Sequence, residues 1–215
     1  MSGQATTPLT LSARGVAVWR GDRCLCHGLN FELHAGEALH VQGSNGAGKT
    51  SLIRVLAGLG RCDAGEVLWQ GEPLRRSGAT YRAAIGYLGH SNGVKLGLSA
   101  RENLTAAGAL RHAPASTDID SALAQVNLHA QADMPCGSLS MGQRRRVALA
   151  RLLLAQVPMW FLDEPLASLD IAGTGLLHAM LDRHLSMGGL AVFATHQPLQ
   201  LAPRPVQTLT LDGPA

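Results

Sequence analysis

Hydrophobic positions along the chain follow two periods, which predict strands towards both ends and helices between them. Short alternating or continuous apolar runs predict strands at residues 9–19, 29–33, 38–42, 66–70, 85–88, 159–162 and 190–194. Apolar residues at helical spacing predict helices at residues 51–58, 99–110, 119–128, 144–155 and 173–185. Residues 111–117 contain Pro114 and are expected to form a loop.

Two of the expected strands, residues 159–162 and 190–194, are apolar without interruption, which is typical of strands covered on both faces. The helix expected at residues 173–185 lies between them in the chain. A strand, a helix and a second strand in this order favour a parallel sheet with a right-handed crossover. The pattern therefore predicts an α/β fold.

The segment GSNGAGKTS at residues 43–51 matches the phosphate-binding loop G-x-x-x-x-G-K-[ST]. It lies between an expected strand and an expected helix, where backbone N–H groups and a helix N-terminus attract phosphate. Lys49 can reach the outer phosphates, and the Thr50 hydroxyl can ligate Mg²⁺. The alternative is a glycine-rich turn with an incidental lysine. The candidate nucleotide-binding residues are Gly43, Ser44, Asn45, Gly46, Ala47, Gly48, Lys49, Thr50 and Ser51.

Two acids, Asp163 and Glu164, follow the expected strand at residues 159–162. The carboxyl ends of parallel strands are where such sheets bind ligands. Nucleotide hydrolysis needs one group to hold Mg²⁺ and another to position the attacking water. We therefore expect Asp163 to hold the metal and Glu164 to act on the water as a general base or polarising group. An exposed acidic turn before Pro165 is the alternative.

A second candidate anion site precedes the helix expected at residues 144–155. Ser140 and Gln143 form the S-x-x-Q capping pattern, which accounts for the serine without any ligand. Gly142 in the first turn costs about 0.5–1 kcal/mol relative to alanine, so close packing or a close ligand is expected to offset it. The three arginines at residues 144–146 are expected to form a solvated or partner-facing surface rather than a nucleic-acid site.

Size and charge narrow the class of protein. The 215 residues, 46% of them hydrophobic, suit one domain with a full core. The net charge of +3 gives no reason to expect a nucleic acid as partner. The most apolar stretch, residues 147–155, is far shorter than the ~20 residues that span a membrane. The start of the chain lacks the basic segment of a secretory signal, so any membrane role is expected to come from a partner chain.

Four cysteines are present, at positions 24, 26, 62 and 136. Cys24, Cys26 and His27 form C-x-C-H, one residue shorter than the haem-attachment pattern C-x-x-C-H. We expect reduced thiols rather than metal ligands at these positions.

Three motifs in chain order resemble those of ATP-binding-cassette (ABC) ATPases: the phosphate-binding loop, LSMGQ at residues 139–143 and WFLDEP at residues 160–165. The resemblance implies an α/β fold with a P-loop NTPase (RecA-like) core built on a parallel sheet, an antiparallel β subdomain and a helical subdomain. It implies a single domain over residues 1–215. The core would occupy about 1–90 and 157–215, and the helical subdomain about 91–156.

Further residues match family positions. Residues 167–170, ASLD, resemble the D-loop, and His196 resembles the switch histidine at the end of a buried strand. The resemblance implies that Lys49, Glu164 and His196 are catalytic and that ATP and Mg²⁺ are bound. It also implies a head-to-tail dimer with a second copy of the chain. In that dimer the cofactor-binding residues Ser140, Gly142 and Gln143 of one copy close over the ATP held by the other.

Two other residues, Trp19 and His90, stand at positions that have a function in the family. Trp19 falls where the family places an aromatic residue that stacks on adenine. After residues 85–89 the family usually carries a glutamine that contacts Mg²⁺, water and the membrane partner, whereas this chain has His90. A neutral imidazole can hydrogen-bond water but ligates Mg²⁺ less readily than an amide oxygen. His90 is therefore either a modified metal-site and coupling residue or a residue of a surface loop.

Four stretches resemble the ATPase subunits of cytochrome c maturation haem exporters: EVLWQGEPL, GYLGH, VKLGLSARENL and THQPLQLA. That resemblance implies polytopic inner-membrane partner subunits and a peripheral position on the cytoplasmic face of a bacterial inner membrane. One alternative is the ATPase of another small-molecule ABC exporter. Another is a soluble ABC ATPase acting on DNA or ribosomes, which usually needs a coiled-coil insertion or a second cassette. A P-loop kinase, the third alternative, has no use for LSMGQ.

Overall fold

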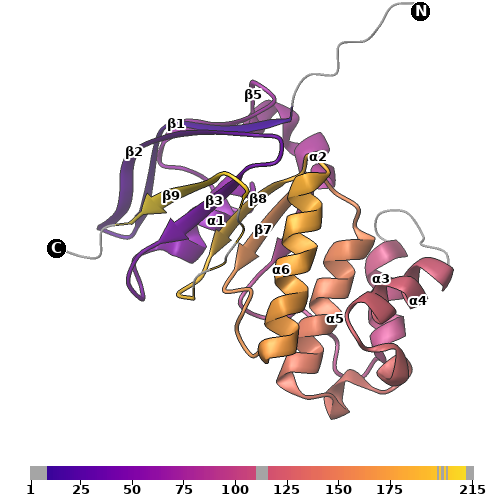
Figure 1. The fold of residues 1–215 in the computed structure, drawn as a ribbon. Coiled ribbons are helices and arrows are strands. Elements are labelled where there is room, and N and C mark those ends of the chain that lie inside the picture. The colour runs from indigo at the N-terminus through magenta and orange to yellow at the C-terminus, as the bar shows by residue number, and fades with distance from the viewer. Residues whose placement is uncertain (1–8, 110–115, 198, 200, 202, 212–215) are drawn as a thin grey trace, which may run out of the picture.

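The structure is a computed structural model that describes residues 9–109, 116–197, 199, 201 and 203–211. Two β-sheets and six α-helices make up this part of the chain (Figure 1). An antiparallel sheet lies beside a parallel sheet, and the helices cover the parallel sheet on both faces and extend away from it at one side.

The antiparallel sheet has the strand order β2-β1-β4-β5. Its strands are β1 (Thr10–Arg20), β2 (Arg23–His34), β4 (Ala64–Trp69) and β5 (Glu72–Pro73). The turn between β1 and β2 is Gly21-Asp22, and Gly21 has a φ of 60°, which glycine adopts without strain. This turn brings the ends of β1 and β2 together as a hairpin.

The parallel sheet has the strand order β6-β7-β8-β3-β9. Its strands are β3 (Ala38–Gln42), β6 (Ile85–Leu88), β7 (Met159–Asp163), β8 (Leu190–Ala194) and β9 (Val206–Thr210). All four neighbouring pairs are parallel, as the strand–helix–strand order predicted. The carboxyl ends of these strands therefore meet at one edge.

Helix α1 (Lys49–Leu56) packs on the face of the parallel sheet that looks towards the antiparallel sheet, whereas α5 (Met141–Leu154) and α6 (Ile171–Ser186) cover the other face. The remaining helices are α2 (Leu74–Ala84), α3 (Ala100–Ala109), α4 (Ser116–Gln125) and two short 3₁₀ turns, His129–Gln131 and Cys136–Ser138. Helices α3 and α4 pack against α5 at one side of the molecule (Figure 1).

Strand alternation divides the hydrophobic core in two. On β7, Met159 and Phe161 point into the core shared with α1 and the antiparallel sheet, while Trp160 and Leu162 point into the core shared with α5 and α6. All five residues of β7 and of β8 are buried. Their uninterrupted apolar sequence is therefore explained by burial on both faces.

The predicted elements are present, with shifted ends and some omissions. Strand β2 is longer than the predicted residues 29–33, and α4 covers residues 116–125 rather than 119–128. Residues 116 and 117, expected in a loop, begin α4, while Leu110 and most of that loop, residues 111–115, lie outside the described residues. The short strand β5, helix α2 and strand β9 were not predicted.

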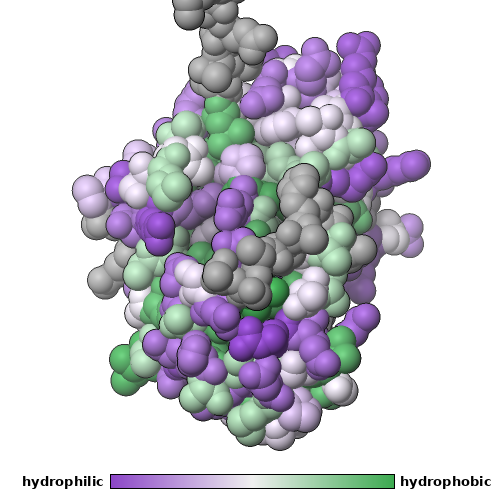
Figure 2. Space-filling view, turned by 90° about the vertical axis from the view of Figure 1, so that its right-hand side faces the viewer, coloured by the Kyte–Doolittle hydropathy of each residue, from purple (hydrophilic) through white to green (hydrophobic). Residues whose placement is uncertain are grey.

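Among the described residues, no helix is both long and apolar enough to cross a membrane. The face on the side of α3 and α4 mixes hydrophilic residues with scattered hydrophobic ones (Figure 2).

Candidate active site

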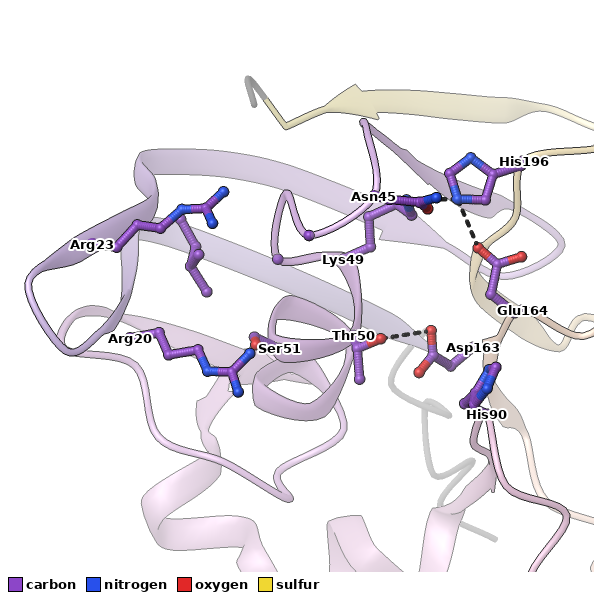
Figure 3. Close-up of a pocket in the computed structure, with 13 residues that line it drawn as sticks. Arg20, Arg23, Asn45, Lys49, Thr50, Ser51, His90, Asp163, Glu164 and His196 are labelled. Carbon is purple, nitrogen blue, oxygen red and sulfur yellow. Dashed lines mark hydrogen bonds and ion pairs between the residues drawn. The ribbon is translucent and has the colours of Figure 1, made fainter. Parts of the chain in front are cut away.

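A pocket of about 310 Å³ lies at the carboxyl edge of the parallel sheet, between that edge and the β1–β2 hairpin (Figure 3). Three parts of the chain line it: the hairpin, the phosphate-binding loop with the start of α1, and the segments that follow β6, β7 and β8. The lining residues are Arg20, Arg23, Leu25, Asn45, Gly46, Gly48, Lys49, Thr50, Ser51, His90, Asp163, Glu164 and His196.

The phosphate-binding loop connects β3 to α1, as its sequence context predicted. Gly43 and Gly48 have φ values of 148° and 104°, which side-chain-bearing residues rarely adopt. A Cβ on Gly43 would lie 2.8 Å from the carbonyl oxygen of Leu211, and one on Gly48 would lie 2.9 Å from the Cβ of Leu25. Both positions therefore require glycine for conformation and for space.

Lys49, the first residue of α1, is buried beneath this loop. Its Nζ donates to the carbonyl oxygens of Gly43 at 2.8 Å and Ser44 at 3.1 Å, so the side chain folds back along the loop. The same Nζ lies 3.1 Å from Nε2 of His196. The ammonium is thus held between the loop and the segment that follows β8.

Thr50 and Asp163 form the pair expected to hold a metal. The Thr50 hydroxyl donates to Oδ1 of Asp163 at 3.0 Å, although the two residues are 113 positions apart in the chain. Asp163 is 1% exposed, and its Oδ2 has no hydrogen-bond partner in the part of the chain that is described. A buried carboxylate oxygen without a partner is costly, and a bound cation would satisfy it. The donors present, a carboxylate and a hydroxyl, are oxygen ligands of the kind that Mg²⁺ prefers.

Glu164 and His196 lie side by side because β7 and β8 are neighbours. Asp163 is paired with Ala194, so the chain leaves both strands at the same level of the sheet. The N–H of Glu164 donates to the carbonyl of Ala194 at 2.9 Å, and Oε1 of Glu164 lies 3.4 Å from Nε2 of His196. Glu164 has a φ of 47°, an uncommon conformation for a non-glycine residue and one that is concentrated at functional sites.

The expectation that residues 144–146 form a solvated or partner-facing surface is wrong for Arg145, because this residue is 1% exposed. Its guanidinium donates to the carbonyl oxygens of Gly89, Asp163, Glu164 and Pro165 and to Oδ1 of Asn92, at 2.6–3.2 Å. Burial lowers the pKa of Arg145 to about 10, against the opposing effect of the nearby acids. Helix α5 is thereby tied to the main chain that carries Glu164 and to the loop that contains His90.

Replacing Arg145 with methionine keeps the length of the side chain but removes every donor. We expect the free energy of unfolding to fall by roughly 2–4 kcal/mol, because several buried carbonyl oxygens lose their partner. Chemical denaturation monitored by circular dichroism measures the change. Arg183→Met on the exposed side of α6 is the matched control and should change stability little. Equal stabilities of the two variants would contradict this role of Arg145.

The start of α5 carries the predicted capping box. Oγ of Ser140 accepts from the N–H of Gln143 at 3.1 Å, and the N–H of Ser140 donates to Oε1 of Gln143 at 2.8 Å. A Cβ on Gly142 would lie 2.8 Å from the carbonyl oxygen of Ser168, so close packing explains the glycine. Residues 140 and 143 do not line the pocket of their own chain.

Residues 167–170 are joined to the start of α5 within the same chain. Asp170 caps α6 by accepting from the N–H of Gly173 at 2.8 Å, and it accepts from Arg146 at 2.7 Å. These two contacts, the backbone one first, lower the pKa of Asp170. Ser168 and Gly142 pack together, so the two segments form one continuous surface outside the pocket.

Of the other sequence-predicted residues, His90 lies in the pocket and Trp19 does not. Trp19 pairs with Cys24 across the hairpin, whereas Arg20 pairs with Arg23, so Trp19 projects from the opposite face. The tryptophan is 46% exposed. The structure therefore does not bring Trp19 to the pocket, and Arg20 and Arg23, which were not predicted from the sequence, lie there in its place.

Cys24 is exposed and Cys26 is half-buried, and burial is the main cause that raises the pKa of the Cys26 thiol. Within the described residues, no group of three or more His, Cys, Asp or Glu side chains could hold a metal ion.

Comparisons with known proteins identify the fold and the family. The model of the ABC transporter family matches residues 26–167. A solved structure of an ABC transporter ATP-binding protein from Pyrococcus furiosus superposes with a TM-score of 0.81 at 23% identity, covering 94% of this chain and 97% of that one. The fold predicted from the sequence is therefore confirmed, and the chain is an ATPase of the ABC transporter class.

Proteins of similar sequence identify the family within the ABC transporter class. The cytochrome c biogenesis ATP-binding export protein CcmA of Methylococcus capsulatus is 47% identical over 192 residues, which cover 89% of this chain and 93% of that protein. The protein of the same name from Dechloromonas aromatica is 46% identical over 203 residues, covering 94% and 99%. The chain thus belongs to the family of cytochrome c biogenesis ATP-binding export proteins, as its sequence motifs predicted.

Proposed function

We propose that this chain hydrolyses ATP with Mg²⁺ as the ATPase subunit of a haem export complex of cytochrome c maturation. The observation that carries the proposal is the pocket itself. It joins a glycine loop for phosphates, a Thr50–Asp163 pair with a free buried carboxylate oxygen, and the Glu164–His196 pair at one edge of the sheet. The family relationship supplies the setting in cytochrome c biogenesis.

Each residue has a role that follows from its position. The N–H groups of residues 44–51 and the Lys49 ammonium bind the phosphates. Thr50 and Asp163 would hold Mg²⁺, which neutralises charge on the phosphate oxygens when it is bound. Glu164 orients the attacking water and takes up its proton, and His196, whose Nε2 lies between Oε1 of Glu164 and Nζ of Lys49, reaches towards the outer phosphate.

The residues at the start of α5 fit a site that is completed by a second copy of the chain. Ser140, Gly142 and Gln143 sit at an accessible helix N-terminus that no group in their own pocket uses. In a head-to-tail dimer, this helix N-terminus of one copy would contact the triphosphate bound by the other. The capping box then keeps the Ser140 hydroxyl and the backbone of Gly142 in a fixed orientation.

We propose polytopic inner-membrane subunits as the partners and the cytoplasmic face of a bacterial inner membrane as the location. His90 supports a link between the site and these subunits. It lines the pocket near Asp163, and its loop is fixed through Asn92 and Gly89 to Arg145 (Figure 3). Displacement of this loop by a partner would therefore reach the main chain of Glu164 through one guanidinium.

Deleting the gene in the source organism is expected to abolish c-type cytochromes while leaving b-type haem proteins at normal levels. Haem staining of separated proteins and difference spectra measure both. The wild-type gene should restore the c-type cytochromes, and a Lys49→Ala gene, whose product lacks the phosphate-binding ammonium, should not. Normal c-type cytochromes in the deletion strain would contradict the haem export role and favour another small-molecule exporter.

A further inference from the structure

The nucleotide pocket has two chemically different ends. Asp163, Glu164 and His196 lie at one end, where the outer phosphate is expected. The β1–β2 hairpin forms the other end and contributes Arg20 and Arg23, with the start of α1 between the two ends (Figure 3). A triphosphate bound by the loop with its outer phosphate at the acids therefore directs the nucleoside towards the hairpin.

We propose that Arg20 and Arg23 form a platform of two guanidinium groups on which the base of the nucleotide stacks. This inference rests on the proposed binding of the triphosphate by the loop at residues 43–51. It adds a base-binding role for residues of the hairpin, at the position where a stacking aromatic residue was expected.

The two arginines carry like charges and are paired with each other across the hairpin. Arg20 is directly opposite Arg23 in the register of the hairpin, and like charges in this position destabilise a sheet. Within the described part of the chain, neither guanidinium forms a hydrogen bond or an ion pair that would offset the repulsion. Two cations that line one pocket without a protein partner are available to a ligand in that pocket.

Besides the two arginines, the hairpin end of the pocket has an apolar lining and no aromatic ring. Leu25, on the same face of β2 as Arg23, packs against Gly48 and gives an apolar surface beside the arginines. The aromatic rings among the lining residues are the imidazoles of His90 and His196. Trp19 projects from the other face of the hairpin. A base at the hairpin end therefore meets no aromatic ring of the lining.

The guanidinium group of arginine is chemically suited to stack on a base. The group is planar and weakly hydrated, and it stacks on aromatic faces while keeping its positive charge. It can thus replace an aromatic ring as a surface for a base. Stacking reads the face of a base and not its edge, so the platform should serve adenine and guanine alike.

The test compares nucleotides with a ligand that has no base. Isothermal titration of the full-length chain with ATP, GTP and inorganic tripolyphosphate, each with Mg²⁺, gives three affinities for every variant. We expect Arg20→Gln and Arg23→Gln each to weaken ATP and GTP binding about tenfold and to leave tripolyphosphate binding unchanged. Arg20→Tyr should bind ATP nearly as well as the wild type, because an aromatic ring also stacks. Arg14→Gln, an exposed arginine of β1 outside the pocket, is the matched control.

A second readout separates binding from folding. Removing one of two opposed like charges should leave the melting temperature of the nucleotide-free protein unchanged or higher, while nucleotide affinity falls. Unchanged nucleotide affinities would overturn the inference, and so would an equal loss for tripolyphosphate, which would assign the arginines to the phosphates. A wild-type protein that binds neither ATP nor tripolyphosphate would instead contradict the proposed function itself.

Discussion

Glu164→Gln is expected to retain ATP binding and to lower ATP hydrolysis by about 10²–10⁴-fold, the range typical of a lost general base. The amide has nearly the same shape as the carboxylate but cannot take a proton from water. The main-chain contacts of Glu164, to Ala194 and to Arg145, do not involve its side chain and should persist. Phosphate release measures hydrolysis, and titration with ATP measures binding.

This substitution should also trap the ATP-bound dimer, because closure no longer leads to hydrolysis. Size-exclusion chromatography with and without ATP shows whether dimers accumulate. Glu32→Gln, an exposed carboxylate of β2 outside the pocket, is the matched control and should behave as the wild type. Near-normal hydrolysis by the Glu164→Gln protein would remove Glu164 from the role of general base.

Ser140→Asp is expected to abolish hydrolysis and dimer formation while leaving nucleotide binding by the single chain intact. Aspartate is as good a helix cap as serine, so α5 should keep its start. The new charge would face the triphosphate held by the other copy and repel it. Ser140→Asn is the matched control, since asparagine also caps a helix and is neutral.

The Ser140→Asn protein should therefore retain measurable activity where the Ser140→Asp protein has none. Equal melting temperatures of the two variants would show that folding is not the cause of the difference. Undiminished hydrolysis in the Ser140→Asp protein would mean that Ser140 lies far from any bound triphosphate, within its own chain or across a dimer.

Elements with uniform local patterns could be predicted from the sequence. Strands β3, β6 and β8 coincide with their predicted limits, and each is followed at once by glycine or a polar residue. Helix α2 was missed because only Tyr81 of its residues is buried, which leaves no apolar stripe to detect. Strand β9 was missed because its residues are only half-buried or exposed at the sheet edge.

Some residues of the site could be predicted from the sequence, and others could not. Gly43–Ser51 and the Asp163-Glu164 pair could be found because their chemistry is contiguous in the chain. Arg145 could not, since its buried partners come from segments 18 to 56 residues away. Arg20 and Arg23 could not either, because the face of the hairpin on which they lie depends on an irregular register between Val18 and Trp19. That irregularity decides which of Trp19 and Arg20 faces the pocket.

A mixture of two inactive proteins distinguishes a site shared between two copies of the chain from a site complete within one copy. Lys49→Ala lacks the phosphate-binding lysine, and Ser140→Asp lacks a usable helix N-terminus, so each protein alone should hydrolyse no ATP. A mixed dimer contains one site with the Lys49 of the second protein and the Ser140 of the first, both intact. If the site is shared between two copies, mixing is expected to restore ATP hydrolysis in proportion to the mixed dimer formed. A mixture as inactive as its two components would contradict it, because every site would then be complete within one chain.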